Sequence, residues 1–445
     1  MRRVSVIGLG YVGLTFSACL ADRGFKVYGV DIDEEKRRLI SEGRPPIYEE
    51  GIEPLLRRAI SSGFLKVTGD FRESVLGSDI TFICVGTPSR PDGSVDLSQV
   101  EDACRRVGEA LRDKEDYHLV VVRSTVPPGT TEGLVRASLE SASGKRVGED
   151  MGLCFNPEFL SEGRAVKGLM NPDRIVVGAI DDRSGKLLLD LYRDFYSDKL
   201  PPILLTSLVN AELIKYANNA FLAMKISFAN MFSRLCGKLR GADVTVVMKG
   251  IGMDSRICDA FLGAGLGWGG SCFPKDNRGI VSYAEGLGVD LKLIKASIEV
   301  NEEQVDYAVE LAERLVGDLR GKLIAVLGLA FKPGTDDVRE SRAIALVERL
   351  LRIGARVRVH DPKAVDNARK VLGENVEYAS SLENCLEDAD LCILATEWPE
   401  YWRLSEGDLK RLMRSPALLD CRRIYDPKSF RGIRFAAIGL GPTSD

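Results

Sequence analysis

The stretch that most constrains the fold lies at the N-terminus, where an apolar run over residues 2–8 leads into a glycine-rich turn. Gly8, Gly10 and Gly13 have the spacing G-x-G-x-x-G, and a helix-like apolar segment and a second strand-like run ending at Asp31 come after them. In a βαβ unit such glycines let backbone N–H groups and a helix N-terminus face a pyrophosphate, and the later acid binds ribose hydroxyls. The pattern therefore predicts a dinucleotide site, and the carboxylate favours NAD over NADP because it repels a 2′-phosphate.

The composition is that of an ordinary globular protein of several domains. A chain of 445 residues exceeds what one compact core accommodates, so two or three domains are expected. Its charges are intermixed and sum to −4, which indicates no surface dedicated to nucleic acid or membrane. The sequence has no apolar run of about eighteen residues and no signal-peptide layout, and its ten cysteines form no CxxC pair or Cys/His cluster. We therefore expect a cytoplasmic protein without metal sites or disulfides.

Histidine is scarce, since the chain has only two, His118 and His360. Each falls at one end of a strand-like run, so a structural role is expected for both. If the protein is an enzyme, Lys, Asp, Glu or Cys would then carry its proton transfers.

The alternation of strand-like and helix-like segments continues after residue 31, as in a doubly wound sheet. Apolar runs over residues 79–86 and 118–123 end beside Thr87 and Thr125. Ligands bind beyond the carboxyl ends of parallel strands, so both threonines are placed to contact a nicotinamide or a ribose. Ordinary turn and cap chemistry explains them equally well.

A pair of glutamates comes next, with Glu158 and Glu162 four residues apart. In a helical turn they would share one face, which suits either paired acid–base work or a solvated surface. The flanking Pro and Gly residues argue against an ordinary solvent-exposed helix.

A long helix is predicted from about Ser207, where apolar residues recur at three- and four-residue intervals. Such a helix usually bridges two domains and offers surface for a dimer interface. Lys215 and Asn219 stand four residues apart on it, amid apolar and alanine-rich sequence. A buried lysine there would have a lowered pKa, whereas a snorkelling lysine beside a cap-like asparagine is the plainer alternative. The apolar positions are Leu208, Ala211, Ile214, Ala217, Phe221, Met224, Phe228 and Phe232.

A second glycine-rich stretch precedes a cysteine. Five glycines fall between Gly263 and Gly270, and Cys272, Lys275 and Asp276 come directly after them. Such density indicates close approach of backbone to another group, or positive φ. A thiol beside a cation could be a nucleophile with a lowered pKa, but a mobile loop ending in an ordinary buried cysteine is the commoner meaning of such a stretch.

From about residue 306 a second βα pattern begins, without the full glycine fingerprint. Lys332 and Arg339 on its first loop could hold a phosphate group. The expected fold is α/β, with two Rossmann-like doubly wound domains joined by a long central helix and a helical middle domain. The two lobes would form a cleft in which two ligands meet. The expected bounds are 1–200 for the N-terminal NAD-binding domain, 201–305 for the central helical and dimerisation domain with the cysteine loop, and 306–445 for the C-terminal lobe.

In order along the chain, the motifs resemble the UDP-glucose/GDP-mannose dehydrogenase family over essentially its whole length. Within that family the sequence is most similar to the UDP-glucose 6-dehydrogenases. Residues 420–423, Asp-Cys-Arg-Arg, stand where Asp-Gly-Arg is more usual, and residues 263–270 are a variant of the substrate loop. The motifs that carry the resemblance are Gly-x-Gly-Tyr-Val-Gly at 8–13, Val-Gly-Thr-Pro at 85–88, Ser-Thr-Val-Pro-Pro-Gly-Thr at 124–130, Asn-Pro-Glu-Phe-Leu at 156–160, Lys215 with Asn219, Gly-Gly-Ser-Cys-Phe-Pro-Lys-Asp at 269–276 and Phe-Lys-Pro-Gly-Thr-Asp-Asp at 331–337.

The resemblance implies an NAD-dependent, four-electron oxidation of UDP-glucose at C6 to UDP-glucuronate, with two NADH formed per turnover. An aldehyde, a thiohemiacetal and a thioester would form in turn, because hydride loss from an aldehyde needs a tetrahedral adduct that a Cys272 thiolate supplies. GDP-mannose or a UDP-N-acetylhexosamine is the alternative substrate for the same chemistry. A two-electron β-hydroxyacid dehydrogenase and a non-catalytic nucleotide sensor are further alternatives, but neither needs Cys272.

The resemblance also implies roles for individual residues and a UDP-sugar site in the C-terminal lobe. In relatives the counterpart of Arg256 reaches the substrate from the neighbouring subunit, so a homodimer is implied. The expected catalytic residues are Cys272 as nucleophile, Lys215 and Asn219 as the pair that stabilises the C6 oxyanion, Asp276 and Glu158 as carboxylates that activate water, and Thr125 as a positioning residue. The expected cofactor contacts are Gly8, Gly10, Tyr11, Val12, Gly13, Asp31, Lys36, Thr87, Thr125, Glu162, Lys275 and Arg339. The expected substrate contacts are Glu158, Phe159, Leu160, Lys215, Asn219, Arg256, Phe261, Leu262, Gly263, Ala264, Gly265, Gly269 and Lys332.

Overall fold

The computed structural model describes residues 2–442, which divide into two compact units. The first unit comprises the chain up to Asn218 together with Arg278–Tyr283. The second comprises Asn219–Asn277 and the chain from Ala284 onward. Within residues 2–442, no helix combines the length and the apolarity that a membrane span requires.

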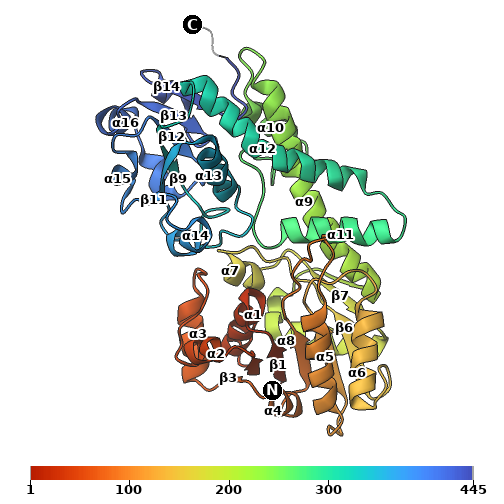
Figure 1. The fold of residues 1–445 in the computed structure, drawn as a ribbon. Helices are drawn as coiled ribbons and strands as arrows, with labels where there is room; N and C mark the ends of the chain where they lie inside the picture. The colour runs from red at the N-terminus through yellow and green to blue at the C-terminus, as the bar shows by residue number, and fades with distance from the viewer. Residues whose placement is uncertain (1, 443–445) are drawn as a thin grey trace. The chain divides into compact units, whose positions relative to one another are not determined.

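The first unit is built on an eight-stranded sheet in the order β3-β2-β1-β4-β5-β6-β7-β8 (Figure 1). All neighbouring strands pair in parallel except β6 with β7. The strand order reverses beside β1, and such a switch point places loops from both directions around one crevice at the carboxyl edge. The strands are β1 Arg3–Ile7, β2 Lys26–Val30, β3 Leu65–Thr68, β4 Ile80–Ile83, β5 His118–Val122, β6 Met151–Phe155, β7 Ile175–Ala179 and β8 Ile203–Thr206.

Helices cover both faces of this sheet, because its strands are apolar on both sides. In β5, Leu119 and Val121 belong to the core under α1, α3 and α8, whereas Val120 and Val122 belong to the core under α5 and α6. Strands buried on both faces are the mark of a doubly wound fold. The helices are α1 Tyr11–Asp22, α2 Glu34–Ser41, α3 Ile52–Ser61, α4 Phe71–Leu76, α5 Ser98–Leu111, α6 Arg136–Ser143, α7 Ala165–Met170 and α8 Asp182–Tyr196.

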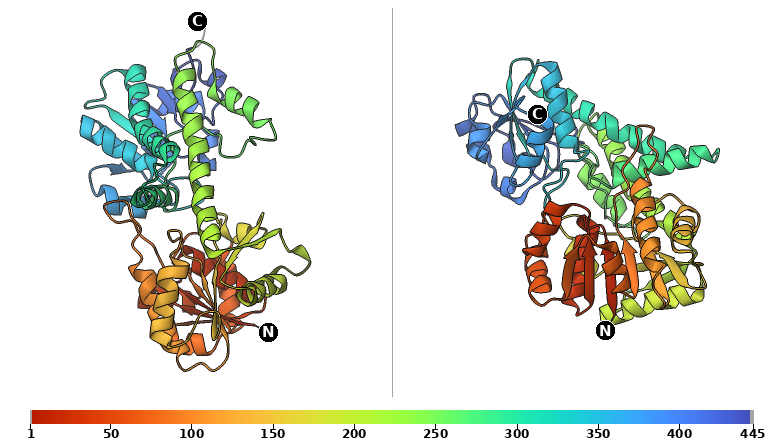
Figure 2. Two further views of the ribbon diagram at one scale, coloured as in Figure 1. Left: turned by 90° about the vertical axis from the view of Figure 1, so that its right-hand side faces the viewer. Right: turned by 60° about the horizontal axis from the view of Figure 1, so that its bottom comes forward.

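The predicted long helix is α9, Leu208–Cys236, which is a single continuous rod in Figure 2. Its first residues, up to Asn218, belong to the first unit and the rest to the second. The apolar periodicity does not mark its buried face. Phe221 and Phe228 are 57% and 41% exposed, whereas Lys215 and Asn219 are buried. The packed face of α9 therefore includes polar side chains, and part of its exposed face is apolar, which reverses the usual pattern of an amphipathic helix.

The second unit contains a six-stranded parallel sheet in the order β11-β10-β9-β12-β13-β14. One hydrophobic core surrounds β9 and includes residues of α12 and α13. The strands are β9 Leu323–Leu327, β10 Arg356–His360, β11 Glu377–Tyr378, β12 Leu391–Leu394, β13 Ala417–Asp420 and β14 Arg434–Ala437. The helices are α10 Val244–Gly252, α11 Phe273–Gly286 (which also enters the first unit), α12 Lys292–Val316, α13 Arg342–Ile353, α14 Val365–Leu372, α15 Leu382–Leu386 and α16 Glu406–Leu412.

Candidate active site

The glycine fingerprint forms the turn between β1 and α1. Gly8 has φ +93°, and a Cβ there would stand 2.8 Å from the carbonyl oxygen of Cys84. A Cβ on Gly13 would stand 1.9 Å from the carbonyl oxygen of Gly8. A Cβ on Gly10 would meet no atom of the described residues within 4 Å, and Gly10 is the N-cap of α1 without a side-chain cap. Packing thus requires glycine at the outer two positions, while the helix N-terminus at Gly10 is open to an anionic ligand.

Asp31 lies beside this turn at the end of β2. Its Oδ2 accepts hydrogen bonds from Leu9 N–H at 2.9 Å and from Lys36 Nζ at 3.0 Å. Gly8, Gly10, Asp31 and Lys36 line a cavity of about 570 Å³. Four of the predicted cofactor contacts therefore share one cavity, with a carboxylate at one side and a helix N-terminus at another. This donor and acceptor set fits the ribose and pyrophosphate of NAD.

Tyr11 connects the glycine turn to the loop after β6. Its hydroxyl donates to Glu49, and the N–H of Gly163 donates to the Tyr11 hydroxyl at 2.6 Å and to Glu49 Oε2 at 2.7 Å. The neighbouring Glu162 is half-buried in this loop. Residues 156–160 have no helical structure, so Glu158 and Glu162 do not share a helix face as the spacing allowed.

Lys215 is buried and paired with Glu158. Its Nζ donates to Glu158 Oε1 at 3.0 Å and to the Glu158 carbonyl oxygen at 2.7 Å, and it lies 5.6 Å from the centre of the Phe159 ring. Burial alone would raise the pKa of the Glu158 carboxyl, but the Lys215 ammonium and the Leu160 N–H outweigh burial and lower the pKa. Glu158 is therefore a carboxylate, and Lys215, 3% exposed, is not a snorkelling side chain.

The turn that carries Thr125 is anchored to the same helix. Glu212, fully buried on α9, accepts the N–H groups of Gly129 at 2.6 Å and Thr131 at 2.8 Å. Burial raises the pKa of Glu212, although these hydrogen bonds oppose the shift. Thr125 itself is half-buried and Thr87 is buried, each just beyond the end of its strand.

Asn219 stands one turn after Lys215 and belongs to a second polar group. Its Nδ2 donates to Asp276 Oδ2 at 2.7 Å, and Lys275 Nζ donates to Asp276 Oδ1 at 2.6 Å. Asp276 is 1% exposed and lies in the first turn of α11, where its N–H donates to the Cys272 carbonyl oxygen at 2.8 Å. The second unit thus brings together the predicted catalytic residues Asn219 and Asp276, the backbone of Cys272, and Lys275, which was predicted as a cofactor contact.

Cys272 is the N-cap residue of α11 and one of two exposed cysteines in the described chain; the other is Cys258. Most of the remaining cysteines are buried in apolar surroundings, which raise their thiol pKa values, to about 12 for Cys104. Exposure at a helix N-terminus distinguishes Cys272 from these structural thiols, because the helix dipole stabilises a thiolate there.

The glycine-rich loop before Cys272 packs against two segments of the second unit. A Cβ on Gly269 would stand 2.2 Å from the Glu340 carbonyl oxygen, and one on Gly265 would stand 2.9 Å from the Cys421 carbonyl oxygen. Phe261, at the start of the loop, has φ +64°. The glycines therefore serve close backbone packing, and the cysteine at the end of the stretch is exposed and not buried. The other predicted loop residues are Leu262, Gly263 and Ala264, of which Leu262 is buried.

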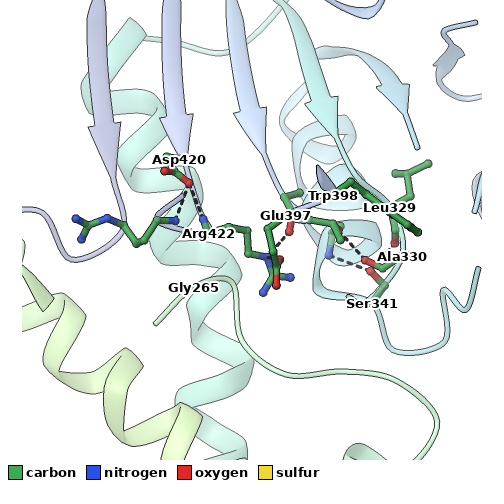
Figure 3. Close-up of polar contacts among 12 residues, drawn as sticks. Gly265, Leu329, Ala330, Ser341, Glu397, Trp398, Asp420 and Arg422 are labelled. Atoms are coloured by element: carbon green, nitrogen blue, oxygen red, sulfur yellow. Dashed lines mark hydrogen bonds and ion pairs between the residues drawn. The ribbon is translucent and has the colours of Figure 1, made fainter. Parts of the chain in front are cut away.

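The sequence reasoning missed one cation in this region, Arg422 (Figure 3). It lies just after β13, and its Nε donates to the Ala395 carbonyl oxygen at 2.5 Å and pairs with Glu397 at 3.2 Å. Buried Asp420 accepts the N–H of Arg422 at 2.8 Å and so fixes the turn. The available signal was the Asp-Cys-Arg-Arg segment at the end of a strand, where a doubly wound sheet presents ligand-binding groups.

Three predicted cations are placed on loops of the second unit. Lys332 and Arg339 lie on the loop between β9 and α13, and Arg339 pairs with Asp337 at 2.7 Å. Arg256 is highly exposed after α10 and pairs with Asp254 at 2.6 Å. Within residues 2–442, the hydrogen bonds and the ion pair of the Arg256 side chain go to Asp254 and not to the residues around Cys272.

Comparison with known proteins identifies the family to which this chain belongs. Models of the UDP-glucose/GDP-mannose dehydrogenase family match residues 2–196 (NAD binding domain), 209–303 (central domain) and 325–427 (UDP binding domain). The chain is 45% identical to the UDP-glucose 6-dehydrogenase AglM of Haloferax volcanii, over 95% of this chain and 96% of that one. It is 40% identical to the UDP-glucose 6-dehydrogenase TuaD of Bacillus subtilis, over 99% and 93%. The structure of a UDP-glucose dehydrogenase from Pyrobaculum islandicum matches with a TM-score of 0.92 at 44% identity, covering 99% of this chain and 98% of that one.

Proposed function

Because this chain belongs to the UDP-glucose/GDP-mannose dehydrogenase family, we propose that it oxidises UDP-glucose at C6 to UDP-glucuronate and reduces two NAD⁺ for each sugar. The observation that carries the proposal is Cys272, an exposed thiol at the N-terminus of α11, one turn before the buried Asp276. A dehydrogenase that stops at the aldehyde has no need of such a nucleophile. UDP-glucose is favoured as substrate because curated relatives that are 39–45% identical to this chain are named UDP-glucose 6-dehydrogenases.

The first oxidation converts the C6 alcohol to an aldehyde. Gly10 and Asp31 would hold NAD⁺, which when bound would supply the hydride acceptor for this and the later oxidation. Lys215 and Asn219, one turn apart on α9, would stabilise the oxygen of C6 as negative charge develops on it. The pairing of Lys215 with the Glu158 carboxylate keeps the ammonium in place and offers an acceptor for the alcohol proton.

The second oxidation requires a covalent adduct. The Cys272 thiolate adds to the aldehyde carbon, and a proton reaches the former carbonyl oxygen to give a thiohemiacetal. Loss of hydride from C6 and of the hydroxyl proton then gives a thioester. Water attacks the thioester carbon, the C–S bond breaks, and the carboxylate and free thiol result. Glu158 and Asp276 are the carboxylates proposed to accept the water proton, with Thr125 positioning the water.

The decisive experiment measures stoichiometry with purified protein and UDP-glucose. We expect two NADH per sugar consumed and a uronate product. Cys272→Ser should bind UDP-glucose yet lose at least about 10³-fold in uronate formation, because the nucleophile is removed. Cys258→Ser, at the other exposed cysteine, is the matched control and should retain parental turnover. Full four-electron turnover by Cys272→Ser would refute the covalent route, and turnover of GDP-mannose or a UDP-N-acetylhexosamine but not of UDP-glucose would change the substrate.

We also propose that the chain functions as a homodimer. Phe221, Phe228, Met231 and Leu235 on α9 are 41–57% exposed, which is unusual for large apolar side chains on one helix of a soluble chain. A second copy would bury them. Sedimentation equilibrium should give twice the chain mass, and Phe228→Asp should shift the protein to monomers; a monomeric parent protein would refute the proposal.

A further inference from the structure

The loop of residues 261–270 contains no helix or strand, so its backbone polar groups need partners from other segments. Asn301 on α12, 3% exposed, supplies two of them. Its Oδ1 accepts the N–H of Trp268 at 2.7 Å, and its Nδ2 donates to the carbonyl oxygen of Trp268 at 3.0 Å. One carboxamide therefore takes the place of the paired hydrogen bonds that a neighbouring strand would give.

Gly265, three residues earlier, is held in the same manner by two buried side chains. Its N–H donates to Asn230 Oδ1 on α9 at 2.8 Å, and its carbonyl oxygen accepts from Gln304 Nε2 on α12 at 2.9 Å. Asn230 and Gln304 are both fully buried. We call Asn230, Asn301 and Gln304 the amide clamp. Each carboxamide pairs with at least one backbone polar group of the loop, although Nδ2 of Asn230 is buried without a hydrogen-bond partner within residues 2–442. These pairings favour one backbone conformation, because leaving a backbone polar group unpaired in the interior is unfavourable.

The clamp also constrains the sequence of the loop and reaches the nucleophile. Gly267 has φ +112°, and a Cβ there would stand 2.3 Å from Asn301 Oδ1. Asn301 can therefore occupy its place in the clamp only if residue 267 is glycine. The buried Trp268 ring lies edge-on to Phe273, with 6.4 Å between ring centroids. Phe273 comes directly after Cys272, and the position of the thiol is thereby linked to the clamped residue.

We propose that Asn301, together with Gln304 and Asn230, is a positioning residue that holds the loop in the conformation that receives the nucleotide-sugar and orients Cys272. This inference rests on the proposed function, which makes the loop the substrate cradle. A glycine-rich loop is costly to order. Ordering it in the free protein removes that cost from substrate binding.

The first test replaces Asn301 with leucine, which is similar in size and makes no hydrogen bond. In Asn301→Leu the KM for UDP-glucose should rise about tenfold or more, because two buried backbone groups lose their partners. The KM for NAD should change less than twofold, since Asn301 belongs to a different unit from the cavity beside Asp31. Ser297→Ala is the matched control, one turn earlier on α12, where Oγ is buried without a hydrogen-bond partner within residues 2–442. A parental KM in Asn301→Leu, or equal rises for both substrates, would overturn the proposal.

A second variant separates hydrogen bonding from packing. In Asn301→Asp the protonated carboxyl offers one donor and one acceptor, as the amide does, whereas the carboxylate offers no donor. The ratio of its KM for UDP-glucose to the parental KM should be near one at low pH and rise as the carboxyl ionises. A ratio that is far above one and independent of pH would contradict the hydrogen-bond account.

Hydrogen exchange in the ligand-free full chain tests the clamp without any turnover. The Trp268 N–H should exchange slowly in the parent and at least about tenfold faster in Asn301→Leu, with α12 itself unchanged. A parent that protects Trp268 but does not oxidise UDP-glucose would refute the proposed function and keep the clamp. A parent that is active while Trp268 exchanges freely would refute the clamp and keep the function.

Discussion

The two sheets of this protein begin with parallel βαβ units that share the backbone geometry of their first turn and differ in the ligand they can take. Gly8 after β1 and Gly328 after β9 have φ of +93° and +96°. Each donates its N–H to the end of the next strand, Gly8 to the Val30 carbonyl oxygen at 2.7 Å and Gly328 to the His360 carbonyl oxygen at 2.8 Å. The same turn is therefore built twice from unrelated neighbouring residues.

The two βαβ units differ in the hydrogen bonds of the aspartate that comes just after the second strand. Asp31 and Asp361 each accept the N–H of the residue after the glycine, at 2.9 and 2.7 Å. Oδ2 of Asp361 also accepts from Ala330 N–H at 3.0 Å and from Trp398 Nε1 at 3.0 Å. Asp31 has Lys36 in place of these neutral donors. The second acid is thus committed to holding its own lobe together, and the first still faces a cavity.

The helix after the turn differs as well. In the first unit α1 begins at Tyr11, directly after the glycine turn, so its N-terminus faces the cavity. In the second unit α13 begins only at Arg342, after a loop that carries Lys332 and Arg339. A pyrophosphate can therefore be bound by a helix N-terminus in one lobe, whereas the other offers side-chain cations for anionic groups. The position at which the helix begins after the turn therefore distinguishes the two lobes.

The largest expected effect concerns the turn that both lobes share. A Cβ at residue 8 would stand 2.8 Å from the Cys84 carbonyl oxygen, and one at residue 328 would stand 2.6 Å from the Thr396 backbone nitrogen. Gly8→Ala and Gly328→Ala should each reduce the free energy of unfolding by about 3 kcal/mol or more, since strain at positive φ adds to the clash. Chemical denaturation of each variant measures this. A loss below about 1 kcal/mol in either one would mean that the two turns are not equivalent.

The two acids should respond to substitution in opposite ways. Asp31→Asn should raise the KM for NAD about tenfold or more while leaving the free energy of unfolding nearly unchanged. Asp361→Asn should do the reverse, with a loss of about 2–3 kcal/mol in the free energy of unfolding because three buried donors face a poorer acceptor. Steady-state kinetics and denaturation of both variants decide the matter. Equal effects of the two substitutions on the KM for NAD would remove the functional distinction between the lobes.

The sequence could predict those parts of the two lobes that local patterns encode. The G-x-G-x-x-G turn, Asp31 and α9 were predictable, because glycine spacing and short-range periodicity specify them. The start of α11 directly after Cys272 was not, since glycines and Pro274 mark a boundary without indicating the type of element beyond it. The roles of the catalytic residues came from the family resemblance, and the division into domains at 200 and 305 stays a prediction.

The buried face of α9 could not be predicted from apolar periodicity. Its packed side holds Glu212, Lys215, Asn219 and Asn230, each with a specific hydrogen-bond partner in the fold. Hydropathy assigns such residues to the surface, because it does not include partners that are distant in sequence. The exposed Phe228 on the same helix shows the converse error. The polar partners of the buried face are set by the tertiary structure and not by local periodicity.

A smaller effect concerns pH, in which the lobes should again differ. His118 in the first unit is fully buried, and desolvation lowers its pKa to about 3, while the unfolded chain has the ordinary value near 6.5. The neutral, buried His118 ring contributes fully to stability above pH 6.5, and this contribution is lost as pH falls toward 3. The free energy of unfolding should have decreased by about 1.4 kcal/mol at pH 5.5 for this reason. The pKa of His360 in the second unit is also lowered by burial, though less far. His118→Gln should flatten the pH dependence of unfolding between pH 7 and 5.5 more than His360→Gln does; equal slopes would contradict the assignment.

The smallest expected effect concerns the ion pair that distinguishes Asp31 from Asp361. Lys36 Nζ lies 3.0 Å from Asp31 Oδ2, and its side chain is 29% exposed, so solvent weakens the pair. Lys36→Ala should therefore raise the KM for NAD only about two- to fivefold, by loosening the carboxylate that meets the ribose. The KM for UDP-glucose should not change, and a substitution of exposed Lys167 is the matched control. Because an uncompensated Asp31 repels a 2′-phosphate more strongly, activity with NADP should fall by a larger factor than activity with NAD. Improved use of NADP by Lys36→Ala would show that the lysine, and not the carboxylate, sets the preference between the two cofactors.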